Sequence, residues 1–203
     1  MIIPALLESR LASLNTKVQL FEGVSPLIHV DFGDGYFVEL KSEFTIEDVA
    51  HLTTRAKLQI HLMCLNPEDQ IQKKYPSIES IVFHAEVSEN YLKTAQTFKS
   101  LGYKVGVCVN IQTPAPEYFG NIDFIQFMAV VPGKQNNTFE QSVVQKISKL
   151  SKLVPETPIQ VDGGLTSTNI PELINAGAST FAVGSFILKS ESPIETYKEL
   201  CGI

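Results

Sequence analysis

Short apolar runs alternate with amphipathic stretches along the whole chain. Runs of this kind, rich in Ile, Val and Phe, are typical of buried strands. Eight of them predict strands, at residues 2–6, 26–31, 57–63, 78–84, 104–109, 122–131, 158–162 and 180–184. Helical patterns lie between and after the strands, at residues 8–20, 46–55, 88–101, 138–153, 168–176 and 193–200, with a helix start at 66–68 and a short stub near Glu117.

A regular alternation of strands and helices is typical of an α/β protein with a parallel sheet. Eight strand-then-helix units in 203 residues predict a closed (β/α)8 TIM barrel near its minimum size. No change of composition marks a linker, so we expect a single domain over residues 1–203. The alternative is an open doubly wound sheet, which carries a glycine fingerprint after its first strand. The first strand here continues as PALLES, which favours the barrel.

Charge and composition argue against several classes of partner. The net charge is −6 and the longest basic run is the pair Lys73 and Lys74, so neither nucleic acid nor an anionic membrane is an expected partner. The first residues lack a signal-peptide pattern, and no stretch of 18 apolar residues occurs, so no membrane span is expected. The three cysteines share no motif spacing, which indicates reduced thiols in the cytoplasm.

In a barrel of this kind the working residues lie at the carboxyl ends of the strands. These ends carry a set of polar and sulfur-containing side chains: His29, Asp31, His61, Met63, His84, Glu86, Asn110, Met128, Asp162 and Ser185. Three of the four histidines of the chain belong to this set. We expect His84 and Glu86 to support the rim of the barrel rather than to act in catalysis.

Two histidines and two aspartates of this set predict a cation site. His29 and Asp31 are two residues apart on one strand, so both side chains point into the barrel mouth. Alternation on two other strands places His61 and Asp162 there as well. This set of nitrogen and oxygen ligands suits one divalent cation such as Zn, Fe, Mn or Co, and does not suit Ca. The alternative is four unconnected polar residues at strand ends.

An anion site is predicted next to Asp162, in the stretch PIQVDGGLTS. Gly163 and Gly164 follow the strand and precede a helix-start signal. Glycine lets the backbone approach a ligand closely, and free N–H groups before a helix attract negative charge. We therefore expect these two glycines to help hold a phosphate.

Seven stretches of sequence, which extend well beyond the four proposed cation ligands, form a recognisable series. They read IHVDFGDGYFV, IHLMCLNPE, IVFHAE, LGYKVGVCVN, MAVVPG, IQVDGGL and AGASTFAVGSFI, and they span nearly the whole chain. In this order they resemble the ribulose-phosphate 3-epimerase family. The resemblance implies a TIM-barrel isomerase that interconverts D-ribulose 5-phosphate and D-xylulose 5-phosphate in the pentose phosphate pathway, with one divalent metal. It also implies a homo-oligomer and a small sugar phosphate as the partner.

The resemblance assigns a role to each matching position. The residues that it implies as metal ligands are His29, Asp31, His61 and Asp162. It gives Asp31 and Asp162 the further role of the two acid/base groups, and it makes Met63 and Met128 walls of the metal site. The positions that match the backbone of the phosphate site are Gly163, Gly164, Gly184 and Ser185.

Departures from the family pattern concentrate on the substrate side. Gly33 stands where the family has a methionine, and Ala5 where it has a serine that touches substrate. The phosphate loop PGFGGQ becomes PGKQNN at residues 132–137. Gly133 keeps one of its three glycines, and Lys134 is the candidate for contacting phosphate through a side chain instead.

Three functions remain open at this point. The first is a metal-dependent 3-epimerase that acts on D-ribulose 5-phosphate through an enediolate. The second is the same chemistry on another ketose phosphate, such as a hexulose 6-phosphate, because the phosphate loop is altered. The third is a barrel that binds a ligand without turnover. Retention of all four cation ligands argues against the third function.

Overall fold

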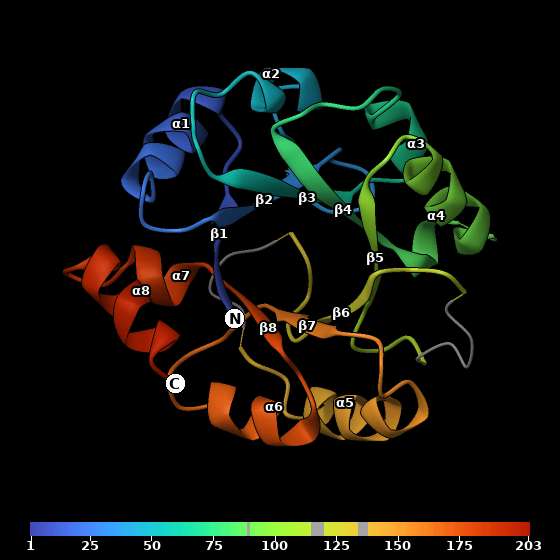
Figure 1. Cartoon of the computed structure of the whole chain (residues 1–203), viewed down its shortest axis with the longest axis vertical. Helices are drawn as coiled ribbons and strands as arrows, with labels where there is room; N and C mark the ends of the chain where they lie inside the picture. Colours follow the sequence, from blue (N-terminus) through green and yellow to red (C-terminus); the bar gives the residue numbers. More distant parts are fainter. Residues whose placement is uncertain (89, 115–119, 134–137) are drawn as a thin grey trace.

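The computed structural model describes residues 1–88, 90–114, 120–133 and 138–203. Eight parallel strands close into a barrel in sequence order (Figure 1). This architecture confirms the predicted TIM barrel. The strands are β1 (Ile2–Leu7), β2 (Leu27–Gly33), β3 (Lys57–Met63), β4 (Ile78–His84), β5 (Lys104–Val109), β6 (Phe124–Met128), β7 (Ile159–Asp162) and β8 (Thr180–Val183).

Helices surround the outside of the barrel wall (Figure 1). They are α1 (Leu11–Leu20), α2 (Ile46–Ala50), α3 (Pro67–Gln70), the 3-10 turn η1 (Ala85–Val87), α4 (Tyr91–Ser100), α5 (Ser142–Leu153), α6 (Ile170–Ala176), α7 (Ser185–Leu188) and α8 (Pro193–Cys201). Within the described ranges, none of these helices has the length and apolar character needed to cross a membrane.

Closure of the barrel depends on pairing between its first and last strands. Ile3 of β1 lies beside Ala182 of β8 in parallel register. Next to this pair, the amino group of Met1 donates a hydrogen bond of 2.6 Å to the carbonyl oxygen of Ser179. An open doubly wound sheet would leave two edge strands with unpaired backbone groups, whereas a closed barrel has none.

Alternation along the strands separates an apolar outer layer from a mixed interior. On β2, Ile28 and Val30 are fully buried in the large core between barrel and helices. His29 and Asp31 have the opposite parity and point into the barrel. A second, smaller cluster of buried apolar side chains comprises Val82, Cys108, Met128 and Val130. The interior therefore combines apolar packing with the polar groups at the mouth.

Several elements differ in extent from the sequence-based expectation; for example, α2 ends at Ala50 rather than at residue 55, and α5 begins at Ser142 rather than at residue 138. β6 ends at Met128 rather than at residue 131, because the backbone bends at residues 129 and 130, after a last hydrogen bond to β7 from the N–H of Ala129 to the carbonyl oxygen of Asp162 at 2.7 Å. Helix α7 was not predicted, because its four residues are too few to show an amphipathic period. The predicted stub near Glu117 lies outside the described residues.

The interior packing generates a prediction about Gly106 of β5. Gly106 lies beside Phe124 of β6 in register, and a Cβ atom at Gly106 would lie 2.3 Å from Cε2 of Phe124. Overpacking of this kind costs about 1–3 kcal/mol, so Gly106→Ala should lower the free energy of unfolding by that amount in chemical denaturation. Adding Phe124→Leu should recover most of the loss. Equal stability of Gly106→Ala and the wild type would contradict this packing.

Candidate metal and substrate site

Three strands bring the predicted cation ligands together at the barrel mouth. His29 and Asp31 come from β2, His61 from β3 and Asp162 from β7. Each offers one nitrogen or oxygen atom, and these four atoms all lie within 4.8 Å of one another. Both imidazoles are fully buried, and both carboxylates are nearly so. The structure therefore places in one cluster the four residues that the sequence suggested as ligands.

Nitrogen and oxygen atoms alternate around the centre of this cluster. Nδ1 of His61 lies 2.9 Å from Oδ1 of Asp31 and 3.4 Å from Oδ2 of Asp162. Nε2 of His29 lies 3.3 Å and 3.6 Å from the same two oxygens. Each imidazole nitrogen thus faces both carboxylates, and each carboxylate faces both imidazoles.

The ring of His29 tests whether these residues fit a divalent cation. Its Nδ1 lies 2.7 Å from Oε1 of Gln59, an acceptor, so Nδ1 carries a proton. Among the described residues, buried Nε2 has no partner with hydrogen-bond geometry, although it faces two carboxylates. In a neutral imidazole this lone pair would face two negative charges, which either a proton on Nε2 or a cation between the groups would relieve. The donor set and this orphaned nitrogen therefore fit a divalent cation.

The pKa values of the two histidines and two aspartates are shifted because two carboxylates and two imidazoles lie close together in a buried site. Burial opposes the charged form of His29, but the contacts with Asp162 and Asp31 outweigh it and raise the pKa of His29 to about 10. The pKa of His61 is raised for the same reasons. Burial would raise the pKa values of Asp31 and Asp162, yet their contacts with both imidazoles lower them. Both carboxylates are therefore held in the ionised form that binds a cation.

Three buried glutamines support the cluster from inside the barrel. Nε2 of Gln160 donates to Oε1 of Gln59 at 2.8 Å and to Oε1 of Gln126 at 2.7 Å. Nε2 of Gln126 lies 3.4 Å from Oδ2 of Asp162. Gln126 was missing from the set suggested by sequence, although it stands two residues before Met128 just as Gln160 stands two before Asp162. Period-two alternation is the signal that could have identified it.

His84 and Glu86 lie at the rim, beside the cluster. Nε2 of His84 is 2.9 Å from Nε2 of His61, and its Nδ1 is 3.5 Å from Oε2 of Glu86. Burial lowers the pKa of His84 to about 4 despite the carboxylate. Burial acts to raise the pKa of Glu86, but hydrogen bonds, among them one from the backbone N–H of Asn110, lower it to about 2. At neutral pH the pair is thus a neutral imidazole and a carboxylate.

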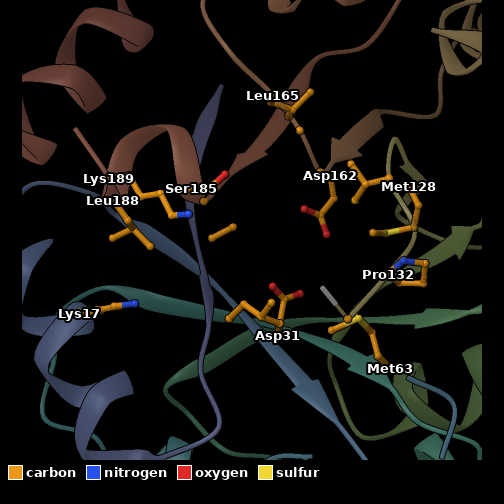
Figure 2. Close-up of a pocket in the computed structure, with 17 residues that line it drawn as sticks. Lys17, Asp31, Met63, Met128, Pro132, Asp162, Leu165, Ser185, Leu188 and Lys189 are labelled. Carbon is orange, nitrogen blue, oxygen red and sulfur yellow. The ribbon is translucent and has the colours of Figure 1, made fainter. Parts of the chain in front are cut away.

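A pocket opens directly above the cation ligands, and both aspartates line it (Figure 2). The other predicted residues that line it are Met63, Met128, Gly133, Gly163, Gly164, Gly184 and Ser185. The structure therefore brings together the substrate-side residues suggested by sequence, apart from Lys134, which lies outside the described residues.

The glycines after β7 are required by close packing. Gly163 has a φ of 103°, and a Cβ atom there would lie 2.3 Å from Cγ2 of Val130. Gly164 has a φ of 66°, and its Cβ atom would lie 3.1 Å from the backbone nitrogen of Phe139. A side chain at either position would move this wall of the pocket. Bare backbone is therefore what the turn presents beside Asp162.

Two lysines that sequence reasoning did not select also line the pocket. Figure 2 shows Lys17 of α1 and Lys189 on one side, Met63 and Met128 on the other, and the two aspartates between them. Nζ of Lys17 also bonds a carboxylate oxygen of Glu8. A lysine on a helix or just after one carries no strand-end signal, so the sequence pattern could not select these two.

Gly33 explains why the family methionine is missing from this wall. A Cβ atom at Gly33 would lie 2.4 Å from the carbonyl oxygen of Leu40. The loop is fixed there because the N–H of Ser42 donates to the carbonyl oxygen of Gly33 at 2.9 Å. Loop backbone therefore occupies the space that a side chain at this position would need.

Comparison with known proteins supports one family for this geometry. The family model described as the ribulose-phosphate 3 epimerase family matches residues 1–188. A chloroplastic ribulose-5-phosphate-3-epimerase from Arabidopsis thaliana is 33% identical, over 96% of this chain and 74% of the relative. A ribulose-phosphate 3-epimerase from Bacillus subtilis is 29% identical, over 99% of this chain and 98% of the relative.

Similarity to solved structures extends to the fold alone. A 3-hexulose-6-phosphate synthase from Salmonella typhimurium superposes with a TM-score of 0.68 at 12% identity, over 99% of this chain and 96% of the other. A tryptophan synthase α-subunit from Pyrococcus furiosus superposes with a TM-score of 0.67 at 13% identity, over 100% of this chain and 98% of the other. The match of sequence over the barrel decides the assignment: the chain belongs to the ribulose-phosphate 3-epimerase family, and it is an enzyme of the isomerase class, a carbohydrate epimerase.

Proposed function

We propose that this enzyme epimerises a ketose phosphate at C3 and that its substrate pair is D-ribulose 5-phosphate and D-xylulose 5-phosphate. The observation that carries the proposal is the position of two carboxylates, Asp31 and Asp162, which line one pocket and lie beside the two buried imidazoles of a cation-binding set. The relatives named ribulose-phosphate 3-epimerase support the choice of substrate. The reaction needs two acid/base groups around one carbon, which this pocket supplies.

The cation of the proposal is one divalent ion, Zn, Fe, Mn or Co. His29, Asp31, His61 and Asp162 would hold it, because their four ligand atoms converge and the set mixes imidazole with carboxylate. When bound, such an ion supplies charge stabilisation for the negative oxygen atoms of an enediolate. The same ion would offset the repulsion between the two carboxylates.

The two aspartates move the protons in the proposed reaction. One carboxylate removes the proton from C3, which leaves an enediolate. The other, which must first take up a proton, then gives that proton to the opposite face of the same carbon. In the reverse direction the two exchange roles. Met63 and Met128 border the same pocket and are nearly fully buried, so they limit the access of water to the reacting carbon.

The phosphate group would lie on the side of the pocket away from the methionines. Backbone at Gly133, Gly163 and Gly164 lines the pocket and can approach an anion closely. Gly184 and Ser185 line it as well. Lys17 and Lys189 add positive charge from the side chains of this region (Figure 2), and Lys134 of the altered loop remains a further candidate.

One observation supports a second candidate substrate, a longer ketose phosphate. The loop at 132–137 has lost two glycines of the family pattern, and lysine side chains line this pocket. A phosphate held by longer side chains lies farther from the barrel wall, which would suit a longer ketose phosphate such as a hexulose 6-phosphate. A barrel without turnover is disfavoured, because both acid/base carboxylates are present in the pocket. We further propose a cytoplasmic enzyme that forms a homo-oligomer, as the family resemblance implies.

Removal of one acid/base group should abolish the reaction. Asp162→Asn should slow turnover at least about 10²-fold, because an amide cannot transfer the proton. Exchange of the C3 proton of ribulose 5-phosphate in D2O, followed by proton NMR, measures this step directly. Asp69→Asn, a change of an exposed side chain on α3, is the matched control and should exchange at the wild-type rate. Exchange by Asp162→Asn within threefold of that rate would refute the mechanism.

Removal of the metal gives a second test. Dialysis against a chelator should eliminate C3 exchange and lower the melting temperature, because a ligand that binds only the native state stabilises it. Adding back Zn, Mn, Fe or Co salts one at a time should restore exchange and identify the preferred ion. Full activity of protein shown by elemental analysis to be metal-free would contradict the proposed cofactor.

The phosphate end is tested by Lys189→Ala. Loss of a charged contact that is equal in the ground and transition states raises KM and leaves kcat unchanged. An increase in KM of about tenfold is expected, which corresponds to about 1.4 kcal/mol. Lys198→Ala on α8 removes an exposed lysine paired with Glu195 and is the control. An unchanged KM in Lys189→Ala would place the phosphate elsewhere, and Lys134→Ala would then be measured in the same assay.

A further inference from the structure

A row of three side chains leads from the cation ligands to the rim. It starts at His61 on β3, passes through His84 on β4 and ends at Glu86 in η1. The two imidazole planes are within 17° of parallel, and their Nε2 atoms are 2.9 Å apart. The acid/base chemistry proposed above does not use His84 or Glu86. Their contact with a cation ligand nevertheless calls for an explanation.

The short distance between two imidazole nitrogens limits where the protons can lie. One nitrogen must carry a proton and the other must offer a lone pair, because two protons or two lone pairs at 2.9 Å would repel. Nδ1 of His61 faces the carboxylates of Asp31 and Asp162, which is the position of a cation ligand. If that nitrogen offers its lone pair to a cation, the proton of His61 is on Nε2 and is donated to Nε2 of His84.

The proton on His84 is then on Nδ1, and its surroundings favour it there. Nδ1 lies 3.5 Å from Oε2 of Glu86, an electrostatic contact without hydrogen-bond geometry among the described residues, and the other oxygen of Glu86 accepts the N–H of Asn110 at 2.8 Å. The side chain of Glu86 is 19% exposed, so its charge acts on His84 with little screening by water. The ring of Phe37 packs against His84 with centroids 4.7 Å apart. These contacts hold the His84 ring in one orientation.

We propose that His84 and Glu86 are positioning residues that hold the proton of His61 on Nε2 and so present its Nδ1 lone pair to the divalent cation. The inference depends on the proposed function only in requiring that cation. A histidine ligand generally donates its other ring proton to an acceptor that fixes its orientation, and removal of the acceptor costs about 10–100-fold in metal affinity. Here the acceptor is a second histidine, oriented in turn by a carboxylate.

The same side chains suggest a competing interpretation. Ligand atoms of His61, His84 and Cys108 lie within 4.8 Å of one another, as a second cation site would require. His61 would then lose both ring protons to serve two ions. Sγ of Cys108 already lies 3.5 Å from Nε2 of Gln126, a donor, and burial raises the pKa of this thiol well above its ordinary value. The arrangement favours a hydrogen-bonded chain over a second ion.

The test is a titration of metal-free protein with Co²⁺, followed by its visible absorption, which reports both affinity and ligand geometry. His84→Phe should weaken Co²⁺ binding about 10–100-fold and alter the absorption bands. His84→Gln should remain within about threefold of the wild type, because its amide oxygen can accept the proton of His61. Glu86→Gln should weaken binding by a smaller factor, since its contact with His84 is longer. Cys108→Ser is the matched control and should bind one equivalent with wild-type affinity.

Each outcome separates this inference from the proposed function. Wild-type affinity and bands in both His84→Phe and Glu86→Gln would overturn the positioning role while leaving the cation site in place. Failure of the wild-type protein to bind Co²⁺ would overturn the cation site and the positioning role together. A second equivalent that Cys108→Ser abolishes would support the two-ion alternative instead. If His84→Phe does not fold, as judged by the melting of the metal-free protein, Glu86→Gln with rescue by Glu86→Asp decides the question.

Discussion

Two carboxylates buried beside two imidazoles set the charge balance on which this barrel mouth depends. Ionised groups are costly to remove from water unless positive charge or hydrogen bonds compensate them. The cluster has such compensation only when the imidazoles are protonated or a cation is bound between Asp31 and Asp162. The surrounding polar side chains, from the glutamines inside to His84 at the rim, provide oriented hydrogen bonds rather than net positive charge. The negative charge of the two carboxylates thus explains why the site suits a cation and why polar side chains surround it.

The register of the parallel strands brings these charged side chains together. Asp31 pairs with His61 across β2 and β3, and Met128 pairs with Asp162 across β6 and β7. Parallel strands end at the same rim, so residues more than a hundred positions apart in the sequence meet there. One acid therefore comes from the first half of the barrel and the other from the second half. A substrate carbon placed between the halves would be approached from two sides.

Much of the fold and of the candidate site could be predicted from the alternation of side chains along strands and from the residues at strand ends. The barrel, its eight strands and the convergence of both histidines and both aspartates follow from runs whose parity decides which face each residue takes. Gln126 obeys the same rule and was predictable in principle, although an uncharged amide gives no chemical signal. Lys17 and Lys189 were not predictable, because the reach of a side chain from a helix depends on how that helix packs. The space at Gly33 depends on a loop carbonyl, which no periodic pattern specifies.

Pairing of β1 with β8 has a consequence during synthesis of the chain. The ribosome makes β1 well before β8, and at roughly 5–20 residues per second the segment between them takes on the order of 10–40 seconds to appear. Until then the backbone groups of β1 that pair with β8 have no partner strand, and Asp31 is present without Asp162. The nascent chain therefore passes through a period in which apolar side chains of the early strands, buried in the finished barrel, are exposed to water.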